Sequence, residues 1–315
     1  MILKKTMAAT IAVGALLLAG CSSTPDDASG ESASPAPSSS SEASASASAT
    51  EKTAYAGTDV SIDAGTHQIP ATVVLPDSAS ADNPVPAVVM LHGTGSQRHE
   101  AGDGYIYMAD ALAKAGIASI RIDFMGSGDS TAPDEDFDLD NALGDAEAAI
   151  GYISEQPEIN AEQVGVMGWS QGGLHALRVA ADDERVRAAV TWAAPAAPME
   201  VTEDQRAEAA EKGYFTEEFD WRAPMDTGQK WIDGMDALDM KDVASQITVP
   251  LLLINGGNDD VVPPSNAEEL HGWIPSSEVL IIDGADHTFN IFSGDMAAFN
   301  ELMTATAGFF ADNLK

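Results

Sequence analysis

The feature that most limits the fold of this chain is a regular alternation of short β-rich runs and helical stretches, which begins near Tyr55. One run, Val85–Leu91, is continuously apolar, as is typical of a strand buried on both faces. Apolar residues at helical spacing follow it, and then Gly116, a residue type that commonly ends a helix. Strands and helices that alternate in this way predict an α/β fold with a doubly wound, mostly parallel sheet.

The expected elements extend to the C-terminus. Strands are expected at residues 60–62, 68–75, 85–91, 117–123, 163–167, 186–192, 250–255 and 279–283. Helices are expected at residues 105–115, 139–153, 170–181, 266–273 and 296–314. The first two strands are expected to form an antiparallel pair. The stretch 197–246 interrupts the alternation with helical segments and no strand, and we interpret it as an inserted helical cap.

The N-terminus has a different character. Lys4 and Lys5 precede an apolar run that ends at Leu18, and small residues lead to Cys21. A basic start, a short apolar run and small residues are typical of a secretory signal, and the run is too short for a membrane-spanning helix. The sequence Leu-Ala-Gly-Cys resembles the lipobox of bacterial lipoproteins. The resemblance implies a signal peptide over residues 1–20 and an acylated Cys21 on the extracytoplasmic face of the cell membrane; an ordinary cleaved signal is the alternative.

Composition separates the segment after the signal from the rest of the chain. Residues 22–50 contain no aromatic or large aliphatic side chain, so we expect 21–54 to be a disordered stalk and 55–315 to be the folded domain. The 15 Lys and Arg residues against 50 Asp and Glu give a net charge of −35. Such a charge argues against nucleic-acid binding and against electrostatic adhesion to anionic lipid, which leaves the lipid anchor as the only expected membrane contact.

A candidate nucleophile lies at the junction of a strand and a helix. The strand expected at 163–167 runs into Gly168-Trp169-Ser170-Gln171-Gly172-Gly173, and a helix follows at once. Such a sharp turn forces its central residue into a strained conformation, and small residues on either side let the strand and helix pack closely. The Ser170 hydroxyl is therefore expected above the carboxyl edge of the sheet, where ligands bind in open α/β folds.

A serine hydroxyl needs a general base, and the base needs an acid that fixes its tautomer. Of the six histidines, His287 stands in a loop after the last expected strand, at the edge where Ser170 is expected. Asp259 and Asp260 both follow the preceding strand, and either is a candidate for the acid.

An oxyanion requires hydrogen-bond donors that are in position before the reaction. In folds with this strand–turn–helix junction, one donor is the backbone N–H after the nucleophile, here that of Gln171. The other comes from the loop after Leu91, where we expect the N–H of Thr94, with Gly95 as the alternative.

These features together resemble the α/β-hydrolase family over nearly all of the chain after the stalk. The order Ser170, Asp259, His287 matches the order of nucleophile, acid and base in that family. The family's acid commonly occupies the fourth position of a Gly-x-x-Asp turn, and Gly256-Gly257-Asn258-Asp259 fits that register, which favours Asp259 over Asp260.

Further segments make the sequence similar to one branch of this family. Residues 121–130 resemble an Arg-x-Asp-x-x-Gly-x-Gly-x-Ser segment found in many family members. With His92-Gly93 and Gly-x-Ser-Gln-Gly-Gly, this segment is similar to the branch that holds feruloyl and cinnamoyl esterases and related acyl-ester hydrolases. Trp169 departs from the His that commonly precedes the serine there, and Trp also occurs at this position in oligopeptidase-like relatives.

The resemblance implies a serine carboxylic-ester hydrolase with a small-molecule acyl-ester substrate. A serine exo- or oligopeptidase of the same fold is an alternative, although such enzymes usually carry a large additional domain for which this chain has no residues to spare. A non-catalytic binding lipoprotein on a hydrolase scaffold is a second alternative. No metal and no organic cofactor is expected. The one Cys in the sequence excludes an intramolecular disulfide and a thiol-rich metal site.

Overall fold

The computed structural model describes residues 57–315. The expected signal peptide 1–20, the lipidation site Cys21, the whole expected stalk 21–54 and the first two residues of the expected domain 55–315 lie outside the described residues. No helix within the described range combines the length and the apolar character needed to cross a membrane.

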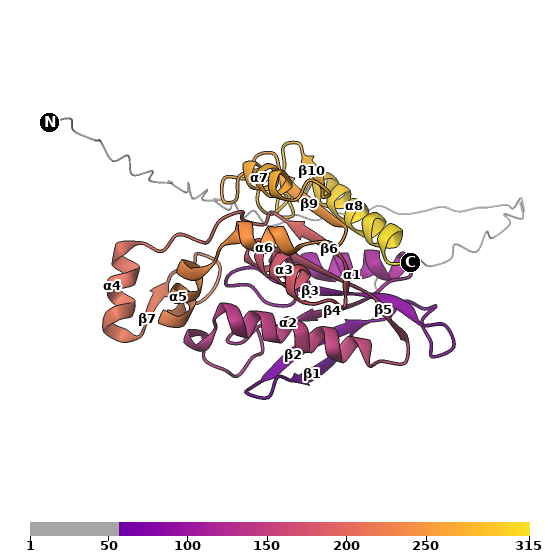
Figure 1. Ribbon diagram of the computed structural model, residues 1–315, viewed down its shortest axis with the longest axis horizontal. Helices are drawn as coiled ribbons and strands as arrows, with labels where there is room; N and C mark the ends of the chain where they lie inside the picture. The colour runs from indigo at the N-terminus through magenta and orange to yellow at the C-terminus, as the bar shows by residue number, and fades with distance from the viewer. Residues whose placement is uncertain (1–56) are drawn as a thin grey trace, which may run out of the picture. The chain divides into compact units, whose positions relative to one another are not determined.

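An eight-stranded sheet forms the centre of the domain (Figure 1). Its strands are β1 (Thr58–Asp63), β2 (Gln68–Val74), β3 (Val85–Leu91), β4 (Ala118–Ile122), β5 (Ile159–Trp169), β6 (Val186–Trp192), β9 (Leu251–Gly256) and β10 (Glu278–Ile282). They lie in the order β1-β2-β4-β3-β5-β6-β9-β10. β1 and β2 pair antiparallel, as does β2 with β4, and all other neighbours are parallel. The expected doubly wound, mostly parallel sheet is confirmed.

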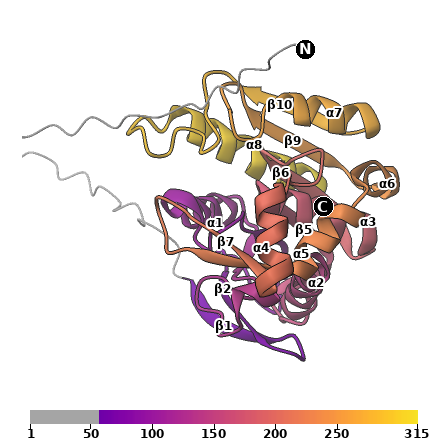
Figure 2. The ribbon, with the colours of Figure 1, turned by 90° about the vertical axis from the view of Figure 1, so that its left-hand side faces the viewer.

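Helices cover both faces of this sheet (Figures 1 and 2). α1 (Gly104–Lys114) and α8 (Ala297–Asn313) share one apolar core with the first face. The second face is covered by α2 (Leu139–Ser154), α3 (Gln171–Asp182), α6 (Met240–Gln246) and α7 (Ser265–Trp273). Two short 3-10 helices, η1 (Ala101–Asp103) and η2 (Asp134–Asp136), lie in the loops after β3 and β4.

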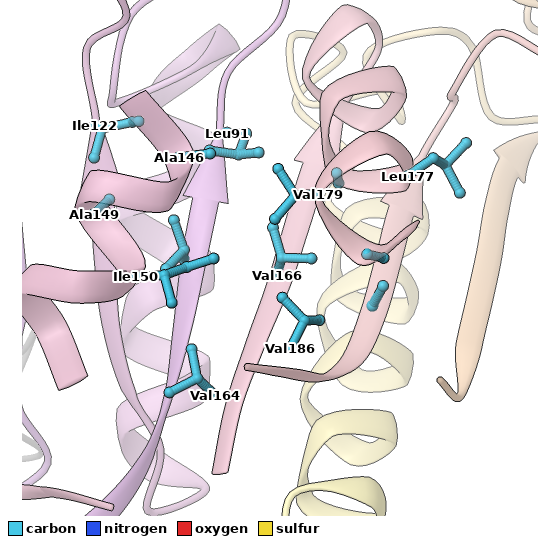
Figure 3. Close-up of a cluster of buried hydrophobic side chains, with 14 of the residues drawn as sticks. Leu91, Ile122, Ala146, Ala149, Ile150, Val164, Val166, Leu177, Val179 and Val186 are labelled. Carbon is cyan, nitrogen blue, oxygen red and sulfur yellow. The ribbon is translucent and has the colours of Figure 1, made fainter. Parts of the chain in front are cut away.

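Side chains of β5 contribute to the apolar cores on both faces of the sheet. Val164 and Val166 are fully buried on the side of α2 and α3, where Ile150 of α2 packs near them (Figure 3). Met167 and Trp169, beyond them on the strand, belong to the core under α1 and α8. A strand that is buried on both faces in this way is held firmly in register, since a slip of one residue would exchange the two sets. The end of β5 is therefore a rigid platform for the turn that follows.

The inserted stretch 197–246 contains strands, so our expectation of a purely helical cap is wrong. α4 (Glu203–Lys212) is followed by β7 (Tyr214–Glu217) and β8 (Met225–Gly228), an antiparallel two-stranded sheet, and then by α5 (Gln229–Ala237). α4, β7 and α5 lie to one side of the main sheet (Figures 1 and 2). Each strand is only four residues long and carries a carboxylate, so neither shows the apolar alternation that marks a longer strand.

A small separate core holds this cap together. Phe215 and Trp231 are buried, with ring centroids 6.5 Å apart, and Leu139 at the start of α2 belongs to the same cluster. The cap also contacts η2. A Cβ atom at Gly228 would lie 2.0 Å from the carbonyl oxygen of Glu135, so only glycine allows β8 to approach η2 this closely.

Candidate active site

Ser170 occupies the tight turn between β5 and α3. Its φ of 56° and ψ of −122° lie in a region that a non-glycine residue adopts only under strain. The glycines on either side are sterically required: a Cβ at Gly168 would lie 1.9 Å from the carbonyl oxygen of Gly172, and one at Gly172 would lie 2.0 Å from that of Leu91. The Ser170 N–H donates to the carbonyl of Trp192 at 2.8 Å, which fixes the turn to β6.

His287 and Asp259 form a hydrogen-bonded pair at the same edge of the sheet. The distance from His287 Nδ1 to Asp259 Oδ2 is 2.8 Å. Asp259 is buried, and its Oδ1 accepts the N–H groups of Val261 and Val262, each at 2.8 Å. Asp260, the other candidate, is exposed. The structure therefore places Asp259, and not its neighbour, against the imidazole.

Ser170, His287 and Thr94 line one open cavity of about 740 Å³. Because Nδ1 of His287 faces Asp259, Nε2 is the nitrogen left to exchange a proton with a group in the cavity. Within residues 57–315, no group of three or more His, Cys, Asp or Glu side chains is arranged to hold a metal ion.

Two backbone donors lie beside the serine. The N–H groups of Thr94 and Gln171 make no hydrogen bond within residues 57–315. The Thr94 hydroxyl donates to Oε1 of Gln171 at 2.8 Å, which ties the two residues together. The loop also passes close to the nucleophile, because a Cβ at Gly93 would lie 3.2 Å from Cβ of Ser170. This arrangement leaves two N–H groups free to receive negative charge that develops near Ser170.

Glu100 holds the loop that carries Thr94, a role for which the sequence alone gives no signal. Its carboxylate accepts the N–H of Gly93 at 2.6 Å, the hydroxyl of Ser96 and the N–H of Ala101 at 2.8 Å. Glu100 itself has a φ of 62°, an uncommon conformation for a residue with a side chain. These hydrogen bonds stabilise the strained residue and fix the loop beside Ser170.

Trp169, which departs from the resembled esterases, contacts the loop of His287. Its indole N–H donates to the backbone carbonyl of His287 at 3.1 Å. The ring is buried among aromatic side chains, including Trp192 at a centroid distance of 5.4 Å and Phe289 at 5.8 Å. Trp169, directly before Ser170, therefore holds the backbone of His287 in place beside Asp259.

His92 lies under the loop, outside the open cavity. Its Nε2 accepts the N–H of Phe124 at 3.1 Å, so Nδ1 carries the proton and donates to the carbonyl of Gly93 at 2.9 Å. Burial lowers the pKa of His92, although Glu100 opposes this effect. Both nitrogens are used in holding the ends of β3 and β4 together.

Residues 121–130 also have a structural role. The buried carboxylate of Asp123 accepts the backbone N–H of Arg98 at 2.6 Å and that of Asp129 at 2.9 Å, and it forms an ion pair with the Arg98 guanidinium. Gly128, with a φ of 55°, lies so close that its Cβ would fall 2.3 Å from this carboxylate. Position 128 must therefore be glycine, because any side chain there would collide with the buried carboxylate of Asp123.

Comparisons with known proteins agree with this architecture. The family model of the alpha/beta hydrolase fold matches residues 86–221 and 211–293. The chain is 26% identical over 218 residues to 2,6-dihydropseudooxynicotine hydrolase of Paenarthrobacter nicotinovorans, a match that covers 63% of this chain but only 51% of that relative. It is 26% identical over 243 residues to pimeloyl-[acyl-carrier protein] methyl ester esterase of Neisseria meningitidis, covering 66% of this chain and 89% of that protein.

Solved structures show the same fold. Est1E from Butyrivibrio proteoclasticus, determined with ferulic acid bound, superimposes with a TM-score of 0.68 at 18% sequence identity. The superposition covers 81% of this chain and 98% of that one. The alpha/beta hydrolase GrgF from Penicillium gives a TM-score of 0.70 at 17% identity, over 82% of this chain and 99% of that one.

Proposed function

The chain belongs to the α/β-hydrolase family, and from this premise we propose that it is a serine carboxylic-ester hydrolase. The observation that carries the proposal is the hydrogen bond between His287 and Asp259 at a cavity that Ser170 also lines. Esterase-like relatives support an ester as the substrate, because one of them is named for the hydrolysis of a methyl ester.

In the proposed reaction, the Ser170 hydroxyl attacks the ester carbonyl while Nε2 of His287 accepts its proton. Asp259 stabilises the resulting imidazolium, and the N–H groups of Thr94 and Gln171 stabilise the oxyanion. His287 then protonates the leaving alcohol, and the acyl group remains on Ser170. A water molecule, deprotonated by His287, attacks the acyl-enzyme and releases the acid.

We also propose that the enzyme is attached to the extracytoplasmic face of the cell membrane by lipid on Cys21. The support lies in the sequence: a basic start, a short apolar run and Leu-Ala-Gly-Cys, followed by a polar segment. That segment would act as a tether between the membrane and the enzyme domain.

The test of the hydrolase proposal compares the wild type with Ser170→Ala on a panel of acyl esters and aminoacyl amides. We expect hydrolysis of esters but not of amides, and a loss of several orders of magnitude in kcat for Ser170→Ala. A fluorophosphonate probe should label the wild type and not the variant. Equal labelling of both proteins would assign the nucleophile to another residue, and turnover of amides alone would point to a peptidase.

A further inference from the structure

Arg222, in the turn between β7 and β8, brings a positive charge to the catalytic cavity. It lines the same cavity as Ser170 and His287. Its Nη1 donates to the carbonyl of Gly95 at 2.9 Å, and Gly95 directly follows Thr94. The guanidinium is therefore fixed beside the loop that carries one of the proposed oxyanion donors.

Arg222 differs from most basic side chains of the domain because it forms no ion pair with a carboxylate among residues 57–315. Five other arginines lie within 4.0 Å of a carboxylate in the described chain: Arg98, Arg178, Arg185, Arg187 and Arg206. Arg121, which also forms no ion pair among residues 57–315, is buried and lies outside the cavity.

Within residues 57–315, the hydrogen bonds and the ring contact of Arg222 are all with uncharged groups. Besides Gly95, Nε donates to the carbonyl of Ala223 at 2.9 Å, and the guanidinium lies 5.7 Å from the ring centroid of Phe219. Nη2 has no hydrogen-bond partner within residues 57–315. A guanidinium presents several N–H donors in one plane, so Arg222 retains donors for an anionic ligand.

No carboxylate of residues 57–315 forms an ion pair with this guanidinium. Glu100 uses both carboxylate oxygens to accept N–H and O–H groups of its own loop. Burial raises the pKa of the Glu217 carboxyl group, and the nearby Arg222 opposes this rise, but the two side chains form no ion pair. Glu218 and Asp220 are exposed, and neither is paired with Arg222. In a chain with a net charge of −35, an unpaired cation at the catalytic cavity is a local attraction for an anion.

Two exposed aromatic side chains lie at the same cavity. Trp221 is 63% exposed and Phe292 is 69% exposed, and both belong to the cavity lining with Arg222. Large apolar side chains exposed in a concave site are typical surfaces for the apolar part of a ligand. Together the three residues match a ligand with an apolar body and a carboxylate.

We propose that Arg222 forms an anion subsite, and that the preferred substrates are esters that carry a carboxylate in addition to the ester bond. The proposal rests on the esterase function proposed above. The carboxylate would accept hydrogen bonds from the guanidinium while the ester carbonyl lies at Ser170 and the apolar body contacts Trp221.

The experiment uses two pairs of esters that differ only in charge. One pair, 4-acetoxybenzoate and 4-acetoxybenzamide, places the charge on the alcohol half. The other, monomethyl adipate and methyl 6-amino-6-oxohexanoate, places it on the acyl half. For at least one pair, we expect the wild type to show a kcat/KM about tenfold or more higher for the carboxylate, as charge-assisted hydrogen bonds typically provide.

Arg222→Gln should abolish this preference, and Arg222→Lys should retain part of it, because lysine keeps the charge without the planar donors. Lys230→Gln is the matched control: it removes one positive charge at an exposed residue that does not line the cavity, and it should keep the wild-type preference. A preference that survives in Arg222→Gln, or a wild type that hydrolyses both members of both pairs equally well, would overturn the subsite while leaving the esterase function intact.

A binding measurement separates the two proposals if the wild type hydrolyses none of the four esters. In that case the esterase proposal fails for these substrates, and quenching of tryptophan fluorescence tests the subsite directly. We expect 4-hydroxybenzoate to bind the wild type more tightly than 4-hydroxybenzamide, and Arg222→Gln to bind both equally. Equal binding of both compounds by the wild type would refute the subsite.

Discussion

At the scale of single residues, we expect the neighbouring Asp259 and Asp260 to differ in their effect on the rate of ester hydrolysis. Asp259→Asn keeps the side-chain shape but can reverse the hydrogen bond to His287 Nδ1 and so favour the wrong tautomer. We expect it to lower kcat for ester hydrolysis by about four orders of magnitude, as in a comparable triad. Asp260→Asn, at an exposed position, should cost less than about tenfold. Steady-state kinetics of the two variants decide the matter, and a large loss only at Asp260 would contradict the assignment.

Trp169 permits a matched test of a positioning role. Trp169→Phe removes the indole N–H that holds the His287 carbonyl, and Trp192→Phe removes an N–H that donates to Thr306 at 2.9 Å, in the same aromatic cluster. Both variants should lose similar stability, measured by denaturant unfolding. Only Trp169→Phe should lower kcat, by about two- to tenfold, the value of one ordinary hydrogen bond, with KM nearly unchanged. If Trp169→Phe and Trp192→Phe changed kcat equally, Trp169 would have only a packing role.

The residues that the sequence predicted for the site share one property: each follows a strand at the same edge of the sheet. The carboxyl ends of mostly parallel strands were sufficient to place Ser170, His287 and one of two aspartates at a common edge. The roles of Glu100 and Trp169 depend instead on particular atoms that meet across the fold, such as the indole N–H and a carbonyl 118 residues away. Neither residue type nor spacing contains that information.

At the scale of elements, the cap contains two tryptophans with different environments. Trp231→Ala should destabilise the protein by about 3–5 kcal/mol, because Trp231 is buried in the cap core. Trp221→Ala should leave the free energy of unfolding nearly unchanged, because this side chain is 63% exposed, but should change the ranking of esters by kcat/KM. Denaturant unfolding and an ester panel measure the two effects. An unchanged ranking in Trp221→Ala would make the cap surface irrelevant to substrate choice.

The cap is also the element that the sequence predicted least well. The central strand β3 of the main sheet has a continuous apolar run that favours a buried strand, and the structure confirms it. β7 and β8 owe their strand conformation to pairing with each other and to contact with η2, at Gly228 in particular. Short strands whose stability comes from tertiary contacts leave little trace in a local pattern.

At the scale of the whole molecule, the proposed lipid anchor would determine where the enzyme works. We expect the full-length protein to sediment with membranes and to incorporate labelled fatty acid, and Cys21→Ser to do neither. The variant should keep the wild-type kcat on a soluble ester, since Cys21 lies outside the enzyme domain in sequence. A wild-type protein found in the soluble fraction, cleaved at a position other than before Cys21, would refute the anchor.

The sequence separation of the contacts at the site has a consequence for the time at which activity arises. Thr94 bonds to Gln171, 77 residues away, and Trp169 to His287, 118 residues away. A contact between such distant segments can form only after both segments have been synthesised and have come together. No fragment that emerges early during synthesis contains a working site. If the chain crosses the membrane unfolded, as the proposed signal implies, it is inert in the compartment where it is made, and hydrolysis begins only where folding is completed.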